Sequence, residues 1–491
     1  MIDNLLLGFS TALSFQNLGW CLLGTILGTA IGVLPGIGTM ATMSMLLPFV
    51  YAVHSPVGSL IMLAGIYYGA QYGGSTTAIL LNVPGESTAV ITSIDGHAMA
   101  QQGRGGSALA IAAIGSFIAG TISTLFVAFL SIPIIDFALE FGPAEYAGLM
   151  LLGIIAAVLL GNKGFFKGLG VTLIGILFGL VGTDITTGIL RFNFKISEFE
   201  DGIPILLLVI GLFGLAEATH YTLTKNKHKN FTKITDKLWP TATDWRRALP
   251  AILRGTALGS FLGILPGAGP VLGAVSSYAL EKQISKYPGE FGNGAVEGVA
   301  GPESANNASA QTSFIPVLTL GLPFTPVMAL LIAAIMVNGI IPGPNLMLDH
   351  PDLFWGLIAS FWIGNVFLLI LNLPLINIWV KLLSVPWSII SSCIVIACIA
   401  GAYTIGYSWF YVYALIPITI FGLILKYLNC EPAPLIMGFV LGPAIEENLR
   451  RSLTISNGNW NIFIDRPYSL TILMVCALVL LLIFYSKIKK C

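Results

Sequence analysis

The sequence predicts an all-α, polytopic integral membrane protein made of two inverted repeats with discontinuous helices or re-entrant hairpins. Three observations lead to this prediction. Of the 491 residues, 56% are hydrophobic and 9% are charged, whereas a soluble domain carries about 25% charged residues. The apolar runs are long and continuous rather than alternating, which favours helices over a β-barrel. Finally, one pattern of glycines and a proline occurs once in each half of the chain.

Candidate membrane spans follow one another along the whole chain. A helix needs roughly 20 mostly apolar residues to cross a bilayer. Several candidates are short or interrupted by Gly and Pro, so we expect about 11 to 13 crossings or half-crossings. The candidates lie at 18–34, 57–81, 107–133, 146–161, 168–190, 203–221, 248–265, 311–341, 354–380, 386–405, 410–427, 432–445 and 468–487.

The densest basic stretch lies near the middle of the chain. Between Tyr221 and Arg254 there are eight Lys and Arg residues against two Asp. The positive-inside rule places this loop in the cytoplasm, together with the basic tail at 485–491. A nucleic-acid-binding arm is the alternative, but the formal net charge of the chain is zero, so we expect no nucleic acid as a partner.

The repeated pattern reads "GTILGTAIGVLPGIG" at 24–38 and "GTALGSFLGILPGAG" at 255–269. Every glycine of the first copy, and its proline, has a counterpart 231 positions later. Glycines spaced four residues apart leave one helix face bare and let another helix approach closely. The Leu-Pro-Gly-x-Gly end then breaks the helix, because Pro removes a backbone donor and Gly permits positive φ.

Apolar sequence resumes directly after each break, so both breaks are expected at membrane depth. Irregular backbone there must be buried in protein or line a watery cavity, and paired interruptions in two halves indicate the substrate site of a carrier. A tight packing corner used twice is the alternative. If the breaks form a site, their backbone carbonyls are candidate ligands for a coupling cation, at Gly36, Gly38, Gly267 and Gly269.

A second pair of motifs follows the breaks, "YYGAQYGGSTTAILLNVPGE" at 67–86 and "GPESANNASAQTSFIPVLTLGLP" at 301–323. Small polar residues that open a helix expose free N–H groups, which attract a carboxylate. The alternative is that each merely caps or bonds its own helix. At the offset of 231, Ser75 and Thr76 correspond to Asn306 and Asn307, although the closing prolines are 239 apart. The candidate substrate-binding residues are Ser75, Thr76, Thr77, Asn82, Asn306, Asn307 and Ser309.

The ionisable residues are interpreted by their surroundings. Glu303 lies inside the Asn-rich cluster, and an acid within the membrane indicates a site, so we expect it to coordinate the cation or to fix Asn306. Asp95 and its neighbours His97 and Arg104 are interpreted as a solvated interfacial loop. The patch after the last broken segment is also expected at the interface and consists of Glu446, Glu447, Arg450 and Arg451.

The predicted organisation is a first transmembrane repeat at 1–222, a basic cytoplasmic linker at 223–247 and a second repeat at 248–467. An inverted repeat needs an odd number of crossings in each half. Because the linker and the tail are both expected in the cytoplasm, 468–491 is interpreted as an extra helix with a basic tail, outside the repeat. Parallel repeats are the alternative.

Several functional classes lack their signature in the sequence. There is no Gly-x-x-x-x-Gly-Lys-Ser/Thr loop for ATP, no His-Glu-x-x-His and no Cys/His cluster. We therefore expect no ATP-driven pump, no metal-dependent enzyme and no cofactor.

The chain closely resembles the large membrane subunit of the tripartite tricarboxylate transporters, the TctA family. The resemblance covers essentially the whole chain and is carried by 32–38, 67–86, 95–106, 263–270 and 301–323. It implies a multi-pass protein of the cell inner membrane that works with a small membrane subunit of about four helices and a periplasmic solute-binding protein. It also implies transport driven by Na⁺ or H⁺, with organic carboxylates such as citrate as substrates.

The function expected from these arguments is a secondary transporter subunit that imports tri- or dicarboxylates by alternating access. A passive anion channel is the first alternative, and a related dicarboxylate carrier that also uses a capture protein is the second. An intramembrane enzyme is a third class, for which the sequence offers no nucleophile or metal cluster.

Overall fold

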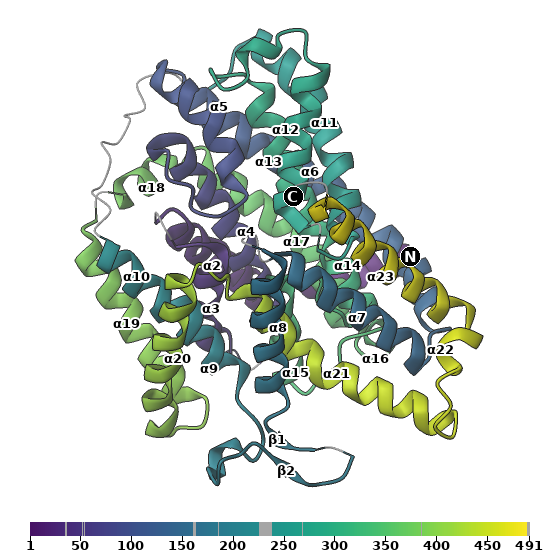
Figure 1. Cartoon of the computed structure of the whole chain (residues 1–491). Helices are drawn as coiled ribbons and strands as arrows, with labels where there is room; N and C mark the ends of the chain where they lie inside the picture. Colours follow the sequence, from purple (N-terminus) through teal and green to yellow (C-terminus); the bar gives the residue numbers. More distant parts are fainter. Residues whose placement is uncertain are drawn as a thin grey trace.

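The computed structural model describes residues 1–34, 37–51, 53, 55–160, 164–184, 186–224, 238–267, 269–383 and 385–488. These are almost entirely helical, with one short strand pair (Figure 1). The elements of the first half are α1 (Ile2–Ala12), α2 (Phe15–Gly32), α3 (Thr39–Tyr51), α4 (Pro56–Leu81), α5 (Ala89–Gln101), α6 (Gly105–Ala138), α7 (Pro143–Leu160), α8 (Phe165–Gly179), β1 (Gly182–Thr183), β2 (Leu190–Arg191), the 3₁₀ turn η1 (Ser197–Phe199), α9 (Ile205–Val209), the π-helical η2 (Ile210–Leu215) and α10 (Ala216–Thr224).

The second half also consists of helices joined by loops. Its elements are α11 (Ala242–Ile264), α12 (Gly269–Ile284), the 3₁₀ turn η3 (Pro288–Glu290), α13 (Glu297–Thr312), α14 (Phe314–Leu320), α15 (Pro326–Val337), α16 (Leu346–Asp349), α17 (Pro351–Asn372), α18 (Ile376–Leu382), α19 (Trp387–Thr404), α20 (Trp409–Tyr427), α21 (Ala433–Ile455), α22 (Ile462–Asp465) and α23 (Pro467–Ile488).

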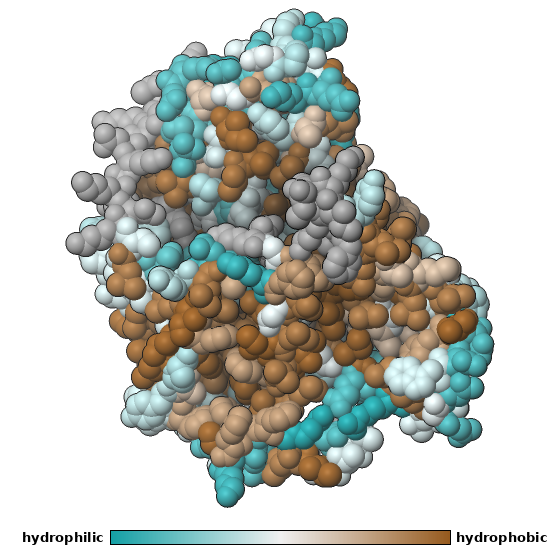
Figure 2. Space-filling view, in the orientation of Figure 1, coloured by the Kyte–Doolittle hydropathy of each residue, from teal (hydrophilic) through white to brown (hydrophobic). Residues whose placement is uncertain are grey.

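The helices confirm the predicted all-α, polytopic membrane fold. Among the described residues, five helices are long and apolar enough to cross a membrane, or six if α1 and α2, bent by 75°, form one broken span. Shorter apolar helices, among them α3 and α15, do not reach the length of a full span. In Figure 2 a broad hydrophobic band separates the hydrophilic surface near α5 and α12 from the hydrophilic surface near β1 and β2. A lipid bilayer matches such a band.

Two of the expected spans are interrupted. The span at 168–190 ends at Gly179, and the chain continues into the β1–β2 hairpin. The span at 311–341 is broken between α14 and α15, where Gly321 has a φ of 68° and Pro323 follows. A left-handed glycine ends a helix and a following proline cannot continue it, so two short helices replace one long span.

The repeated glycines bring two helix pairs into backbone contact. On α2, a Cβ atom added at Gly24, Gly28 or Gly32 would lie 2.3 to 2.5 Å from a carbonyl oxygen of α4. On α11, a Cβ added at the equivalent glycines would lie 2.2 to 2.3 Å from a carbonyl oxygen of α13. Both pairs therefore depend on the bare glycine face that the sequence predicted.

The register of these contacts corrects the alignment of the second pair of motifs. Gly24 faces Met62, whereas its counterpart Gly255 faces Gly301, eight residues further along. The two broken helices also end alike, in the left-handed residues Asn82 and Gly321. Residues of α4 therefore correspond to residues of α13 and α14 at an offset of 239. The extra eight residues lie in the longer connection between α12 and α13, so Ser75 is not the counterpart of Asn306.

The two halves are interleaved rather than side by side. The long helix α6 of the first half packs on α13 of the second, and α17 of the second half packs on α4 of the first. Helices α7 and α8 pack on α21, while α19 and α20 pack on η2 and α10. In Figure 1, α6 runs downward from α5 toward the start of α7, whereas α17 runs upward from α16 to α18. The corresponding long helices thus run in opposite directions, as in an inverted repeat.

Candidate functional site

A cavity of about 690 Å³ lies where both repeats break. Its wall contains the first residues of four helices, two from each half. These are Gly38 and Thr39 of α3, Ser87 and Thr88 before α5, Gly269 and Pro270 of α12, and Thr325 and Pro326 of α15. Ligand pockets for small organic molecules occupy about 300–1,000 Å³, so the cavity has the size of a substrate site.

Local sequence places these four helix starts at the cavity. In the second half, α11 ends at Ile264, and Gly267 and Gly269 take φ values of 72° and 55°, which only glycine adopts without strain. The chain then turns directly into α12. In the first half, a Cβ added at Gly85 would lie 2.5 Å from the Cα of Gly74, so glycine is needed where the chain leaves Pro84 and approaches α5.

Four helix starts make the cavity attractive to anions. The first N–H groups of a helix have no partner within the helix, and the macrodipole adds partial positive charge there. Pro326 of α15 and Pro270 of α12 have no backbone N–H, and at α15 the backbone N–H of Met328 already donates to Thr325 Oγ1 at 3.3 Å. The remaining donors can bind carboxylate or phosphate oxygens.

A carboxylate also lines the large cavity. Glu86 accepts hydrogen bonds from the hydroxyls of Thr39 and Thr88, the latter at 2.5 Å, and from Asn306 Nδ2 at 3.3 Å. Glu86 is the last residue of the motif at 67–86 and is not among the site residues predicted from the sequence. The signal that could have found it is an acid directly after the Pro-Gly that ends a broken helix.

The lining of the large cavity also contains charged residues of α10 and α20. Lys426 of α20 lies 2.5 Å from Glu217 of α10 in an ion pair, and His220 and Glu431 line the same cavity. Glu217 and His220 lie on α10, which is described as far as Thr224, and residues 225–237 of the predicted basic linker lie outside the described residues.

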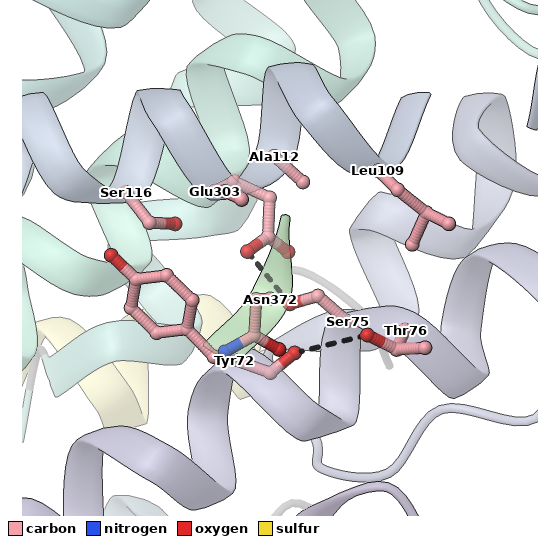
Figure 3. A pocket seen from close by; sticks show the side chains of 9 residues that line it. Tyr72, Ser75, Thr76, Leu109, Ala112, Ser116, Glu303 and Asn372 are labelled. Atoms are coloured by element: carbon pink, nitrogen blue, oxygen red, sulfur yellow. Dashed lines mark hydrogen bonds between the residues drawn. The ribbon is translucent and has the colours of Figure 1, made fainter. Parts of the chain in front are cut away.

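A second, much smaller cavity of about 10 Å³ lies among α4, α6, α13 and α17 (Figure 3). This volume holds about one water-sized particle. Glu303 is 1% exposed, and its carboxylate accepts hydrogen bonds from Ser75 Oγ at 2.8 Å and from the hydroxyl of Thr92. The cavity is lined by Tyr72, Ser75, Thr76, Leu109, Ala112, Ala113, Ser116, Glu303 and Asn372.

The polar clusters do not open helices, which corrects the structural basis of the prediction. Ser75 and Thr76 lie near the C-terminal end of α4, and Asn306 and Asn307 lie in the middle of α13. Their backbone N–H groups are therefore used inside the helices. The reason is that α4 begins earlier, at Pro56, after the side-chain cap from Ser55. The free helix starts belong instead to α3, α5, α12 and α15.

The structure brings some of the predicted side chains together and separates others. Ser75, Thr76 and Glu303 share the small cavity, and Asn306 reaches Glu86. The remaining four candidates make contacts elsewhere or end a helix. Asn307 Nδ2 donates to Ser116 Oγ at 2.6 Å, Thr77 Oγ1 donates to the carbonyl of Gly74, Ser309 packs against Gly263, and Asn82 is the left-handed residue that ends α4.

The candidate cation ligands at the breaks are also apart from Glu303. Gly38 and Gly269 line the large cavity, while Gly267 faces Ala156, and Gly36 lies outside the described residues. The carbonyl of Gly38 accepts the N–H of Thr42 at 3.0 Å. In this conformation it is therefore part of helix α3.

Asp95 is not a solvated loop residue, contrary to the interpretation from sequence. It lies on α5 and is 0% exposed. Its Oδ1 accepts the backbone N–H groups of Gly292, Gly294 and Ala295 at 2.8 to 2.9 Å, and its Oδ2 accepts the hydroxyl of Tyr278. The carboxylate thereby ties the first half to the connection between α12 and α13.

The charged patch on α21 forms ion pairs with the loop that contains β1 and β2. Arg450 pairs with Asp184 at 3.0 Å, and Arg191 pairs with Glu446 at 3.0 Å. These ion pairs attach the loop that contains β1 and β2 to α21. The patch therefore has a structural role in holding this loop.

Comparisons with known proteins identify the family. Residues 18–437 match the model of the tripartite tricarboxylate transporter TctA family. A protein of Agrobacterium vitis described as an uncharacterized 52.8 kDa protein in the TAR-I ttuC' 3' region is 51% identical over 485 residues, which are 98% of this chain and 96% of the relative. A second protein of the same organism, described as an uncharacterized protein in the TAR-II ttuC' 3' region, is 54% identical over 227 residues, or 46% of this chain and 94% of the relative. No solved structure matches. This multi-pass membrane chain therefore belongs to the tripartite tricarboxylate transporter TctA family.

Proposed function

We propose that the chain is the transport subunit of an ion-gradient-driven carrier that imports organic di- or tricarboxylates across the inner membrane. The observation that carries the proposal is the 690 Å³ cavity at which four helix starts, two from each half, meet. Bare N–H donors from opposite sides match a molecule that carries carboxylates at both ends. The family adds a transport function.

The proposed mechanism is alternating access around this cavity. In carriers made of inverted repeats, substrate sites lie between the repeats at discontinuous helices, and one part of the protein moves against the other. Lys426 pairs with Glu217 of α10, and in the sequence α10 is followed by the basic linker that the positive-inside rule predicts to be cytoplasmic. Substrate would leave past this ion pair after a periplasmic binding protein has delivered it to the opposite side. A small membrane subunit completes the proposed complex, and a Na⁺ or H⁺ gradient drives it.

A passive anion channel and an intramembrane enzyme are the competing functions. A channel conducts without a coupling ion, whereas a carrier shows counterflow, in which labelled substrate accumulates against unlabelled substrate inside vesicles. For the enzyme, no group of three or more His, Cys, Asp or Glu side chains suited to a metal ion occurs within the described part of the chain.

The test is uptake of radiolabelled citrate, with succinate in parallel, by proteoliposomes that contain this chain, the small subunit and the binding protein. We expect gradient-dependent uptake and counterflow. Lys426→Gln is expected to raise the KM by about ten-fold. The variant removes the proposed contact between the Lys426 ammonium and a substrate carboxylate, and such a charge-assisted contact contributes about 1.5–3 kcal/mol. Lys282→Gln, an exposed residue of α12 outside the cavity, is the matched control.

Two results would overturn the proposal. One is equal carboxylate flux with and without an ion gradient, combined with an absence of counterflow, which indicates a channel. The other is an unchanged KM in both Lys426→Gln and the control, combined with an unchanged KM when Thr39 and Thr325 at the helix starts are replaced by Val.

A further inference from the structure

The polar lining of the small cavity consists of groups whose protons are engaged elsewhere. The hydroxyl of Ser75 donates to Glu303 at 2.8 Å, that of Tyr72 donates to Asn365 Oδ1 at 3.0 Å, and that of Thr76 donates to the carbonyl of Tyr72 at 3.5 Å. A hydroxyl that has donated its proton retains its oxygen lone pairs. These three side chains therefore present acceptors to the cavity.

Asn372 adds an acceptor that has no hydrogen-bond partner among the described residues. Its Nδ2 donates to the carbonyl of Leu368 at 2.9 Å, which leaves Oδ1 as the end that faces the cavity. The side chain is 3% exposed, and a buried acceptor without a partner costs about 1–3 kcal/mol. Figure 3 shows Asn372 and Glu303 converging on the side chains of α4 from two other helices.

Glu303 brings a carboxylate to the same place without an ion-pair partner in the described part of the chain. A charge buried in protein is costly unless it is paired or coordinates a metal ion. The residue types also matter, because carboxylate, amide carbonyl and hydroxyl oxygens are the ligands that hard cations prefer.

We propose that this cavity is a Na⁺ site, coordinated by the carboxylate of Glu303, by Asn372 Oδ1 and by the hydroxyl oxygens that line it. A volume of about 10 Å³ admits one particle of the size of a water molecule, which is enough for one dehydrated Na⁺ and too small for an organic ligand. One bound ion then provides a partner for Asn372 Oδ1 and for the cavity-lining hydroxyl oxygens, and it neutralises the unpaired charge of Glu303. The site draws on both repeats, since α4 and α6 belong to the first half and α13 and α17 to the second.

The position of the site gives it a role in coupling, and this role rests on the proposed function. Asn306 lies one helical turn after Glu303 on α13 and donates to Glu86 at 3.3 Å, and Glu86 lines the large cavity. A cation beside Glu303 thus fixes a segment of α13 that contacts the anion cavity. Binding of Na⁺ alone does not depend on any substrate, so it can be tested separately.

The experiment measures binding of ²²Na⁺ to the purified full-length chain in nanodiscs, with choline as the replacement cation and without carboxylate. We expect saturable binding that Li⁺ displaces and K⁺ does not. Asn372→Ala and Thr76→Val are each expected to weaken binding by about ten-fold, since each removes one contact to a charge. Glu303→Gln is expected to abolish binding.

Asn338→Ala is the matched control, because Asn338 makes the same bond to the carbonyl four residues earlier, with Ala334, but lines neither cavity. Thr76→Val retains side-chain shape, which protects the test against a folding defect, and size-exclusion chromatography checks each variant. Absent ²²Na⁺ binding, or equal binding in wild type, Asn372→Ala and Thr76→Val, overturns the inference. If the Na⁺ site is overturned but citrate uptake persists, the proposed function still holds. If Na⁺ binds as expected but no carboxylate is transported, only the proposed function is overturned.

Discussion

The helix that packs on the glycine face of α2 in the first half, α4, and its counterpart on α11 in the second half, α13 with α14, have the same backbone arrangement but different polar side chains. Both lie against a glycine-bare helix at the same spacing, and both end in a left-handed residue before a proline. At the offset of 239, however, the position of Glu303 is occupied by Ala64 in α4, and Glu86 corresponds to Thr325. Glu303 and Glu86 therefore each lie at a position where the other half has no acid.

This difference teaches how a duplicated chain acquires two distinct cavities. The glycine contacts fix the distance between backbones, and any side chain there would separate the helices. The polar positions carry no such constraint and have diverged. The backbone arrangement that both halves have in common places four helix starts at the large cavity. The acids and amides that differ between the halves provide each cavity with different candidate ligands.

The largest expected effect comes from breaking the shared contact. Gly28→Ala and Gly259→Ala each place a Cβ within 2.3 Å of a backbone oxygen, and overpacking of this kind costs about 1–3 kcal/mol or more. We expect a strong and similar loss of folded protein for both, measured by fluorescence-detected size exclusion. Gly19→Ala is the control on the same helix, since nothing lies within 4 Å of its added Cβ. A large effect in only one half would contradict the equivalence of the two contacts.

The next effect concerns the eight additional residues of the second half. Asp95 holds their connection through three backbone N–H groups, and hydrogen bonds to a charged group contribute about 1.5–3 kcal/mol. Asp95→Asn is therefore expected to lower the thermal midpoint of the purified protein by several degrees, roughly as a loss of about 3 kcal/mol does. Asp136→Asn, at an exposed position of α6, should leave the midpoint unchanged. An unchanged midpoint in Asp95→Asn would show that the connection is held by other contacts.

The smallest effect concerns the loop that contains β1 and β2, which joins α8 to α9 through 25 residues at 180–204. The backbone N–H of Thr186, then the hydroxyl of Thr187 and the guanidinium of Arg450, lower the pKa of Asp184 from 3.8 to about 2. A carboxyl with a lowered pKa stabilises the folded state above its unfolded pKa, and this contribution is lost as the pH falls through the folded value.

We therefore expect protection of this loop against hydrogen exchange to be constant from pH 8 to about 5, because Asp184 stays ionised there, and to fall between about pH 4 and 2. Asp184→Asn should show lower protection, and its remaining protection should not change across the acidic window. Equal acid sensitivity in the wild type and this variant would show that another group controls the loop.

Much of the scaffold was predictable from sequence, and the site was predictable only in part. The glycine faces and the breaks after them were predictable because each has a local sequence pattern. The patterns are glycines four residues apart and the Leu-Pro-Gly-x-Gly sequence that follows them. The eight-residue difference was visible in the motifs, whose closing prolines are 239 apart instead of 231, but the sequence did not show that the additional residues lie before α13. Ser75 and Asn306 were interpreted as helix starts because short polar clusters in apolar sequence are typical of caps. Asn372 had no local signal at all, because only the packing of α17 on α4 places it beside the small cavity.

The measurement that tests the central claim most directly uses Cys430, a free thiol that lines the large cavity. Its rate of alkylation by a small maleimide is measured with and without saturating citrate or succinate, while the exposed Cys393 of α19 reports nonspecific effects. If the carboxylate binds among the four helix starts, alkylation of Cys430 slows several-fold and that of Cys393 does not change. Unchanged alkylation of Cys430 at carboxylate concentrations that saturate transport would place the substrate elsewhere and contradict the account.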